Sequence, residues 1–224
     1  MTFVAMVGDR NLTYESHRAI EATVALLSDD VDMRWVGTDD PDFRRTVESA
    51  DAVWALPGTP YVNAAATYGA ITHARTTGQP FLGTCGGFQY AMVEYAHNVA
   101  GWKGAGHAET EPDAEELVVD RLACSLFGEQ RTVTTVAGTK LAELCGTEPF
   151  VGCHFCNFGV PDVQMSRLVQ HGVIVSAHAE DAGVEGIELP DHPFFVATLF
   201  QPQMAAFQNE GVHPLIHALI EAGS

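Results

Sequence analysis

Short apolar runs alternate with helix-like segments over the first half of the chain. The apolar runs contain few charged residues, as strands covered on both faces do, and span residues 3–7, 33–36, 52–56 and 81–84. The segments between and after them carry apolar residues at helical spacing and span residues 15–27, 43–47, 64–74 and 88–99. This alternation predicts βαβ units and a mostly parallel sheet between two layers of helices, which is an α/β fold.

The second half of the chain is richer in extended segments. These segments span residues 131–136, 151–158, 173–176, 186–189 and 194–200, and helices are predicted at 163–171 and 214–221. Residues 109–120 hold six acidic residues and no basic one, which favours a solvated loop that leads into a strand. We therefore predict an antiparallel C-terminal extension of the sheet. The chain contains no linker rich in Pro, Gly or Ser, so we expect one domain over residues 1–224.

Composition narrows the possible partners. The chain has 224 residues, 11 of them Lys or Arg and 29 of them Asp or Glu, for a net charge of −18. Such an excess of negative charge argues against a nucleic acid or an anionic membrane as partner. No apolar stretch approaches the roughly 20 residues that cross a bilayer. With five cysteines and no signal peptide, we expect a cytoplasmic protein with reduced thiols.

The most informative local feature is residues 83–89, which read Gly-Thr-Cys-Gly-Gly-Phe-Gln. A predicted strand ends directly before Cys85, and a predicted helix begins directly after it. The flanking glycines permit a tight turn that pushes the cysteine side chain out of the sheet, and a helix N-terminus lowers the pKa of a thiol beside it. This pattern is typical of a nucleophilic cysteine. A small buried residue in a tight strand–helix connection is the structural alternative.

This pattern, G-x-C-x-G-x-Q, resembles the nucleophile elbow of class I glutamine amidotransferases. The chain is most similar to the C-terminal glutaminase domain of CTP synthase, of the CTP synthase C-terminal region-related type, some of which are labelled selenoproteins. Further matching segments lie at residues 55–58, 94–99, 187–196 and 213–215. The resemblance implies a three-layer α/β/α, flavodoxin-like fold with Cys85 as nucleophile and Gln89 in the substrate site. It also implies an oxyanion hole from the backbone of Gly58 and Gly86, and no synthetase domain in this chain.

Two departures from the family pattern set this sequence apart. Where the family has F-H-P-E, residues 200–203 read Phe-Gln-Pro-Gln, so Gln201 and Gln203 stand in the places of the catalytic His and Glu. A Gln side chain does not take a proton near neutral pH. Where the family has an Arg–Tyr pair for the amino-acid end of glutamine, the chain has Phe155 and Cys156, which form no ion pair with a carboxylate. We therefore expect neither standard glutaminase activity nor CTP synthesis from this chain.

These observations leave three hypotheses. The first is a hydrolase or transferase acting on a small amide or another C–N bond. Cys85 would be the nucleophile and His154 the base, because alternate residues of its strand face the pocket. His178 and His192 are weaker alternatives, and a purely structural role for His154 is equally open. Substrate contacts are expected from Gln89, Cys153, Phe155, Cys156 and Gln201.

The second hypothesis is a thiol-redox or metal site built from Cys85, Cys153, His154 and Cys156. The C-x-x-C spacing at 153–156 supports it, but residues three apart on a strand point to opposite faces. The third is a non-catalytic sensor or partner subunit. We expect a small-molecule ligand and no organic cofactor, assign no metal ligand, and leave open a homo-oligomer or a partner enzyme.

Overall fold

The computed structural model describes residues 1–180 and 182–224. Its main feature is a nine-stranded sheet with the order β2-β1-β3-β4-β12-β11-β10-β7-β8. Five neighbouring strands are parallel: β2 (Val31–Val36), β1 (Thr2–Val7), β3 (Ala52–Ala55), β4 (Phe81–Thr84) and β12 (Phe195–Thr198). The remaining four are antiparallel to their neighbours: β11 (Gly183–Glu188), β10 (Ile174–Ala179), β7 (Glu129–Thr135) and β8 (Phe150–His154). This arrangement confirms the predicted mostly parallel sheet and its antiparallel extension.

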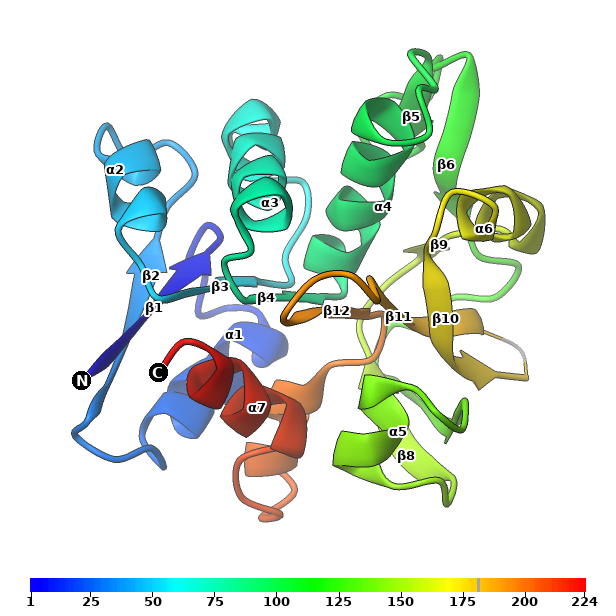
Figure 1. Cartoon of the computed structure of the whole chain (residues 1–224). Helices are drawn as coiled ribbons and strands as arrows, with labels where there is room; N and C mark the ends of the chain where they lie inside the picture. Colours follow the sequence, from blue (N-terminus) through cyan, green and yellow to red (C-terminus); the bar gives the residue numbers. More distant parts are fainter. Residues whose placement is uncertain (181) are drawn as a thin grey trace.

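Helices cover both faces of this sheet (Figure 1). One face carries α2 (Phe43–Glu48), α3 (Ala64–Thr77) and α4 (Gly86–Asn98), and the other carries α1 (Glu15–Val24), α5 (Lys140–Cys145) and α7 (Pro214–Ala222). Beside α4 lie α6 (Asp162–Val169) and a small sheet of β5 (Ala105–His107), β6 (Glu116–Arg121) and β9 (Phe158–Gly159). The layers are those of a three-layer α/β/α fold.

The hydrophobic core is divided by the sheet, as β3 illustrates. Val53 and Ala55 belong to the cluster that packs under α2, α3 and α4, whereas Trp54 belongs to the cluster that packs against α1 and α7. Successive strand residues point to opposite faces, so an apolar run of four residues serves both layers. The central strands can therefore stay short and fully apolar, and they form a rigid base for the loops at their carboxyl ends.

Two segments near the turn at Cys85 and the end of β12 illustrate how the structure differs from the sequence-based expectations, which also lacked α5 and β5. Residues 151–158, predicted as one strand, are divided into β8 and β9, because residues 155–157 leave the sheet. There the backbone carbonyls of Cys156 and Asn157 accept hydrogen bonds from the N–H groups of Leu126 and Leu122. The chain after β12 forms a short 3-10 helix (Pro202–Ala206) that the sequence did not indicate, and Pro202 occupies its first position.

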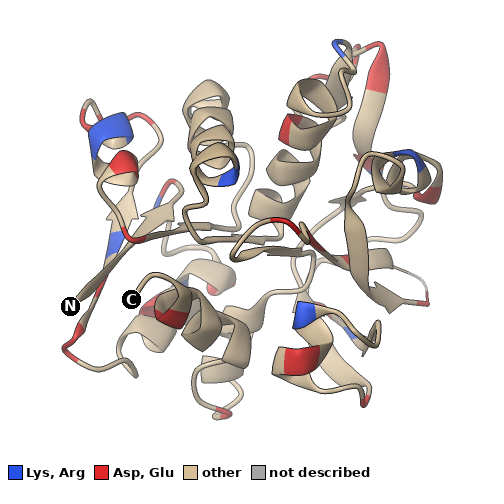
Figure 2. Ribbon diagram, in the orientation of Figure 1, with Lys and Arg blue, Asp and Glu red and all other residues tan. Residues whose placement is uncertain are grey.

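Charged side chains lie mostly at the periphery of the layers. Figure 2 shows the Lys and Arg positions scattered over helices and strands of both faces, with acidic positions spread around them. Within the described residues, no helix is both long enough and apolar enough to cross a membrane.

Candidate active site

The tight turn at Cys85 is built as the sequence predicts. β4 ends at Thr84 and α4 begins at Gly86, and Cys85 between them has φ 52° and ψ −103°. Such a backbone conformation is costly for any residue other than glycine and persists only where the surroundings impose it. The surroundings here are backbone: a Cβ on Gly87 would lie 2.2 Å from the carbonyl oxygen of Ala55. The neighbouring strand therefore holds the turn in place.

A cavity of about 340 Å³ opens at this turn. Its walls come from the N-terminal end of α1, the loop after β3, the start of α4 and the break between β8 and β9. The lining residues are Thr13, Tyr14, Glu15, Ser16, Arg18, Pro57, Gly58, Thr59, Cys85, Gln89, Glu109, Phe127, Phe155, Cys156, Asn157, Phe158 and Gln201. Of the residues predicted from the sequence, Cys85, Gly58, Gln89, Phe155, Cys156 and Gln201 thus share one cavity, and Gly86 directly follows Cys85.

The loop that carries Gly58 is fixed by a buried histidine. His17 Nδ1 accepts a hydrogen bond from the Asn11 N–H at 2.9 Å, so the ring proton sits on Nε2, which donates to the Pro57 carbonyl at 2.9 Å. Burial lowers the pKa of His17, which favours this neutral form. Gly58 has φ 104°, and a Cβ there would lie 2.7 Å from His17 Nε2. Only glycine fits this close approach.

Both ends of the Gln89 amide are bound by the protein. Gln89 Nε2 donates to the Phe158 carbonyl at 2.8 Å, and Gln89 Oε1 lies 3.1 Å from His107 Nε2. The His107 Nδ1 accepts from the Glu109 N–H, so Nε2 is the donor, and burial lowers the pKa of His107 to about 4. Gln89 thereby ties α4 to β9 and shapes the cavity wall.

Gln201 and Gln203 form a buried amide pair at the end of β12. Gln203 Nε2 donates to Gln201 Oε1 at 2.8 Å. Gln201 is 2% exposed, and its Nε2 has no hydrogen-bond partner among the described residues. Gln201 also lines the cavity, so an unpaired buried amide N–H belongs to a residue of the cavity wall.

The two cysteines of the C-x-x-C segment are separated. Cys156 lines the Cys85 cavity, where its thiol is hydrogen-bonded to Cys85; this bond and burial raise the pKa of the Cys156 thiol well above its ordinary value. Cys153 lines a different cavity of about 350 Å³, where its sulfur lies 3.2 Å from Gln208 Nε2. The predicted four-residue cluster is therefore wrong for Cys153, because β8 directs it to the opposite side. In the described part of the chain, no three His, Cys, Asp or Glu side chains are grouped to hold a metal ion.

His154 is also placed differently from the expectation. It is fully buried, and its Nε2 lies 2.9 Å from both carboxylate oxygens of Glu185. Its Nδ1 has no hydrogen-bond partner among the described residues, and His154 does not line the Cys85 cavity. The geometry therefore gives His154 no contact through which it could take a proton from Cys85. Side chains alternate along β8, and the face that carries His154 is closed by Glu185 of β11.

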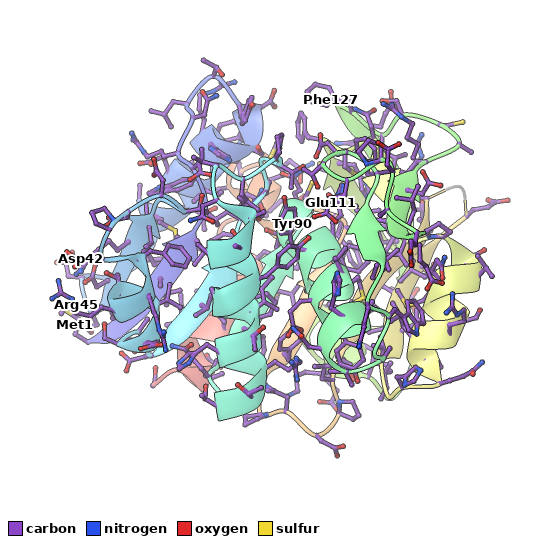
Figure 3. All side chains as sticks on the ribbon, turned by 90° about the horizontal axis from the view of Figure 1, so that it is seen from above. Met1, Asp42, Arg45, Tyr90, Glu111 and Phe127 are labelled. Carbon is purple, nitrogen blue, oxygen red and sulfur yellow. The ribbon has the colours of Figure 1, made fainter. Side chains whose placement is uncertain are left out.

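Several cavity residues were not identified from the sequence. Residues 13–16 and Arg18 follow the carboxyl end of β1, and in parallel sheets ligands bind at the carboxyl ends of the strands, so their position could have pointed to them. Arg18 donates to the carbonyls of Leu12 and Thr13. Phe127, at the outer edge of the molecule in Figure 3, packs edge-to-face on Phe155 at 5.6 Å. No local signal marks Phe127 or Glu185.

Comparison with known proteins agrees with the family resemblance seen in the sequence motifs. The family model of peptidase C26 matches residues 64–203. The chain is 36% identical to CTP synthase of Pyrobaculum aerophilum over 173 residues, which cover 73% of this chain and 32% of that protein. It is 32% identical to CTP synthase of Aeropyrum pernix over 231 residues, covering 94% of this chain and 42% of that protein. The chain thus spans well under half the length of these relatives.

Solved structures share the fold. The glutaminase domain of Trypanosoma brucei CTPS, solved with bound acivicin, superimposes with a TM-score of 0.84 at 22% identity, over 100% of this chain and 94% of that chain. A glutamine amidotransferase from Thermotoga maritima gives a TM-score of 0.53 at 14% identity, over 100% of this chain and 90% of that chain.

Proposed function

Because the chain belongs to the peptidase C26 family, we propose that it is a cysteine-dependent hydrolase or transferase that acts on a small amide or another C–N bond. The observation that carries this proposal is the position of Cys85, on a strained turn at the N-terminus of α4 and in the wall of a cavity. A helix N-terminus and free backbone N–H groups favour negative charge at this point.

The proposed reaction follows from these groups. The Cys85 sulfur attacks the electrophilic carbon, and the backbone N–H groups of Gly58 and Gly86 hold the negative charge that develops on the substrate. The thiol proton passes to the leaving nitrogen as the C–N bond breaks, so that an amine or ammonia departs; water then cleaves the thioester, which releases the acid and returns a proton to the Cys85 sulfur.

Two features support a reaction other than standard glutamine hydrolysis. No histidine is among the cavity-lining residues in the described chain, so Cys85 acts without an imidazole beside it and with the Cys156 thiol as its hydrogen-bond partner. In addition, Phe155 and Cys156 offer no cation to the carboxylate of a free amino acid. We infer a substrate without a free amino-acid end.

The test compares two buried cysteines of the reduced full chain on a panel of small amides, with glutamine included. We expect Cys85→Ala to lower turnover by about a thousandfold or more, because the covalent step is lost, and Cys153→Ala to leave it nearly unchanged. With glutamine as substrate, the unmodified chain should release ammonia no faster than the Cys85→Ala variant does.

Iodoacetamide labelling separates catalysis from a purely binding role. A nucleophilic Cys85 should be alkylated faster than the exposed Cys124, as followed by peptide mass spectrometry. Full turnover in Cys85→Ala would end the proposal. A Cys85 that is no more reactive than Cys124, together with no turnover of any amide, would favour the sensor or partner-subunit role instead.

A further inference from the structure

Two thiols from distant parts of the chain meet in the same cavity. Cys85 and Cys156 are both free and buried, both line the cavity, and the Cys156 thiol is hydrogen-bonded to Cys85. Cys85 is held by the turn between β4 and α4. Cys156 is held by the break between β8 and β9, where its carbonyl accepts from the Leu126 N–H at 3.0 Å. Both backbones are therefore anchored at the wall of the shared cavity.

The other three cysteines are placed elsewhere. Cys124 is exposed, Cys145 is half-buried, and Cys153 lies in the separate cavity with amide donors from Gln208 and Gln130 around its sulfur. All five cysteines lie within the described residues. Cys156 is therefore the thiol that can reach an oxidised Cys85 without a rearrangement of the fold.

We propose that Cys85 and Cys156 are a peroxide-reactive dithiol, which a small hydroperoxide entering the cavity converts into a reversible disulfide. This modification site does not depend on amide turnover. A cavity of about 340 Å³ admits a small hydroperoxide, and Phe127, which is 64% exposed, forms its outer wall.

The two steps balance as follows. The Cys85 sulfur attacks the terminal oxygen of the hydroperoxide, the O–O bond breaks, and the thiol proton leaves with the alcohol or water, so that Cys85 becomes a sulfenic acid. The Cys156 sulfur then attacks the Cys85 sulfur, the S–S bond forms, the S–O bond breaks, and the hydroxyl leaves as water with the Cys156 proton. Two thiols are oxidised to one disulfide, and one hydroperoxide is reduced to an alcohol and water.

The contact between the two sulfurs favours this order of events. The hydrogen bond with Cys85 and burial raise the pKa of the Cys156 thiol well above its ordinary value, which keeps Cys156 protonated and unreactive. Oxidation of Cys85 to a sulfenic acid replaces the thiol that takes part in this hydrogen bond. The hydrogen bond that restrained Cys156 is then lost, at the moment when a resolving thiol is needed.

The test treats the reduced full chain with tert-butyl hydroperoxide, blocks the remaining thiols with N-ethylmaleimide under denaturing conditions, and analyses peptides by mass spectrometry. We expect a peptide pair cross-linked through Cys85 and Cys156, a fall from five free thiols to three, and full reversal by dithiothreitol. Cys153→Ser is the matched control and should give the same disulfide yield.

Cys156→Ser provides the decisive comparison. Without the resolving thiol, Cys85 should proceed to sulfinic acid, which dithiothreitol does not reverse, at least about tenfold faster than in the unmodified chain. The melting temperature of each variant is measured first, and Cys156→Ala replaces a serine variant that does not fold. Equal rates of sulfinic acid formation in the chain and its Cys156 variant, a disulfide to Cys153, or a Cys85 that does not react would each overturn the proposal. None of these outcomes depends on whether an amide substrate is found.

Discussion

The parallel and antiparallel halves of the sheet hold their parts of the site by different means. The parallel half positions Cys85 through backbone contact, with Gly87 packed directly on the carbonyl of Ala55. The antiparallel half relies on buried polar side chains, above all the pair of His154 and Glu185. The difference shows that the turn needs space free of side chains, whereas the antiparallel half is held by hydrogen bonds between buried side chains of distant strands.

The largest effect is expected from Gly87→Ala in the parallel half. The added Cβ would lie 2.2 Å from the Ala55 carbonyl oxygen, so either the turn or β3 must move. We expect a loss of about 3 kcal/mol or more in the free energy of unfolding, measured by urea denaturation. Gly69→Ala, in α3 with open space around it, is the matched control and should stabilise by about 0.5–1 kcal/mol. A Gly87→Ala protein of unchanged stability would contradict the backbone-contact interpretation.

In the antiparallel half, Glu185→Leu should cost about 3 kcal/mol of unfolding free energy. The substitution leaves His154 Nε2 and the Phe200 N–H buried without their acceptor. The double variant His154→Leu/Glu185→Leu removes one of these orphaned donors, so it should recover part of the loss. If the double variant is as unstable as the sum of the single variants, the pair does not act as a unit.

A smaller effect per residue is expected from acid, and it concerns two histidines outside the nine-stranded sheet. Burial lowers the pKa of His107 and of His213 to about 4, whereas the unfolded chain titrates near the usual value of 6.5. The unfolded state therefore binds protons first as the pH falls. Each histidine contributes stability that is complete above about pH 6.5 and is lost as the pH falls towards 4, by about 2 kcal/mol at pH 5.

Urea denaturation between pH 7 and 5 measures this loss, and His213→Asn isolates one contribution. Asn keeps an acceptor for the Leu215 N–H at the start of α7 but does not titrate. The variant should lose less stability between pH 7 and 5 than the unmodified chain. An identical pH profile would show that His213 does not contribute to the acid sensitivity.

The sequence predicts best the elements whose conformation depends on residues adjacent in the chain. The Cys85 turn, the central strands and the helices that follow them are marked by apolar runs and glycines, and the structure has them at nearly the expected bounds. The contacts between distant segments are not marked in this way. The meeting of Cys85 with Cys156, and of His154 with Glu185, depends on strand order and on the break after β8, for which the sequence has no pattern.

For the C-x-x-C segment, the sequence predicted one part of the structure correctly and another part wrongly. The alternation of side chains along a strand predicted that Cys153 and Cys156 would point apart, and they line different cavities. The same alternation was used to place His154 in the pocket, and there it failed, because the His154 ring is bonded to Glu185 and the part of this segment that lines the cavity is residues 155–158.

The backbone at Cys85 has a consequence for how this position is selected. With φ 52° and ψ −103°, residue 85 adopts a conformation that glycine reaches at little cost and that any side chain makes unfavourable by about 1–3 kcal/mol. Selection for stability alone would thus replace this cysteine with glycine. A cysteine at this position lowers folding stability and places a thiol in the cavity wall, which is the compromise that the proposed nucleophile requires.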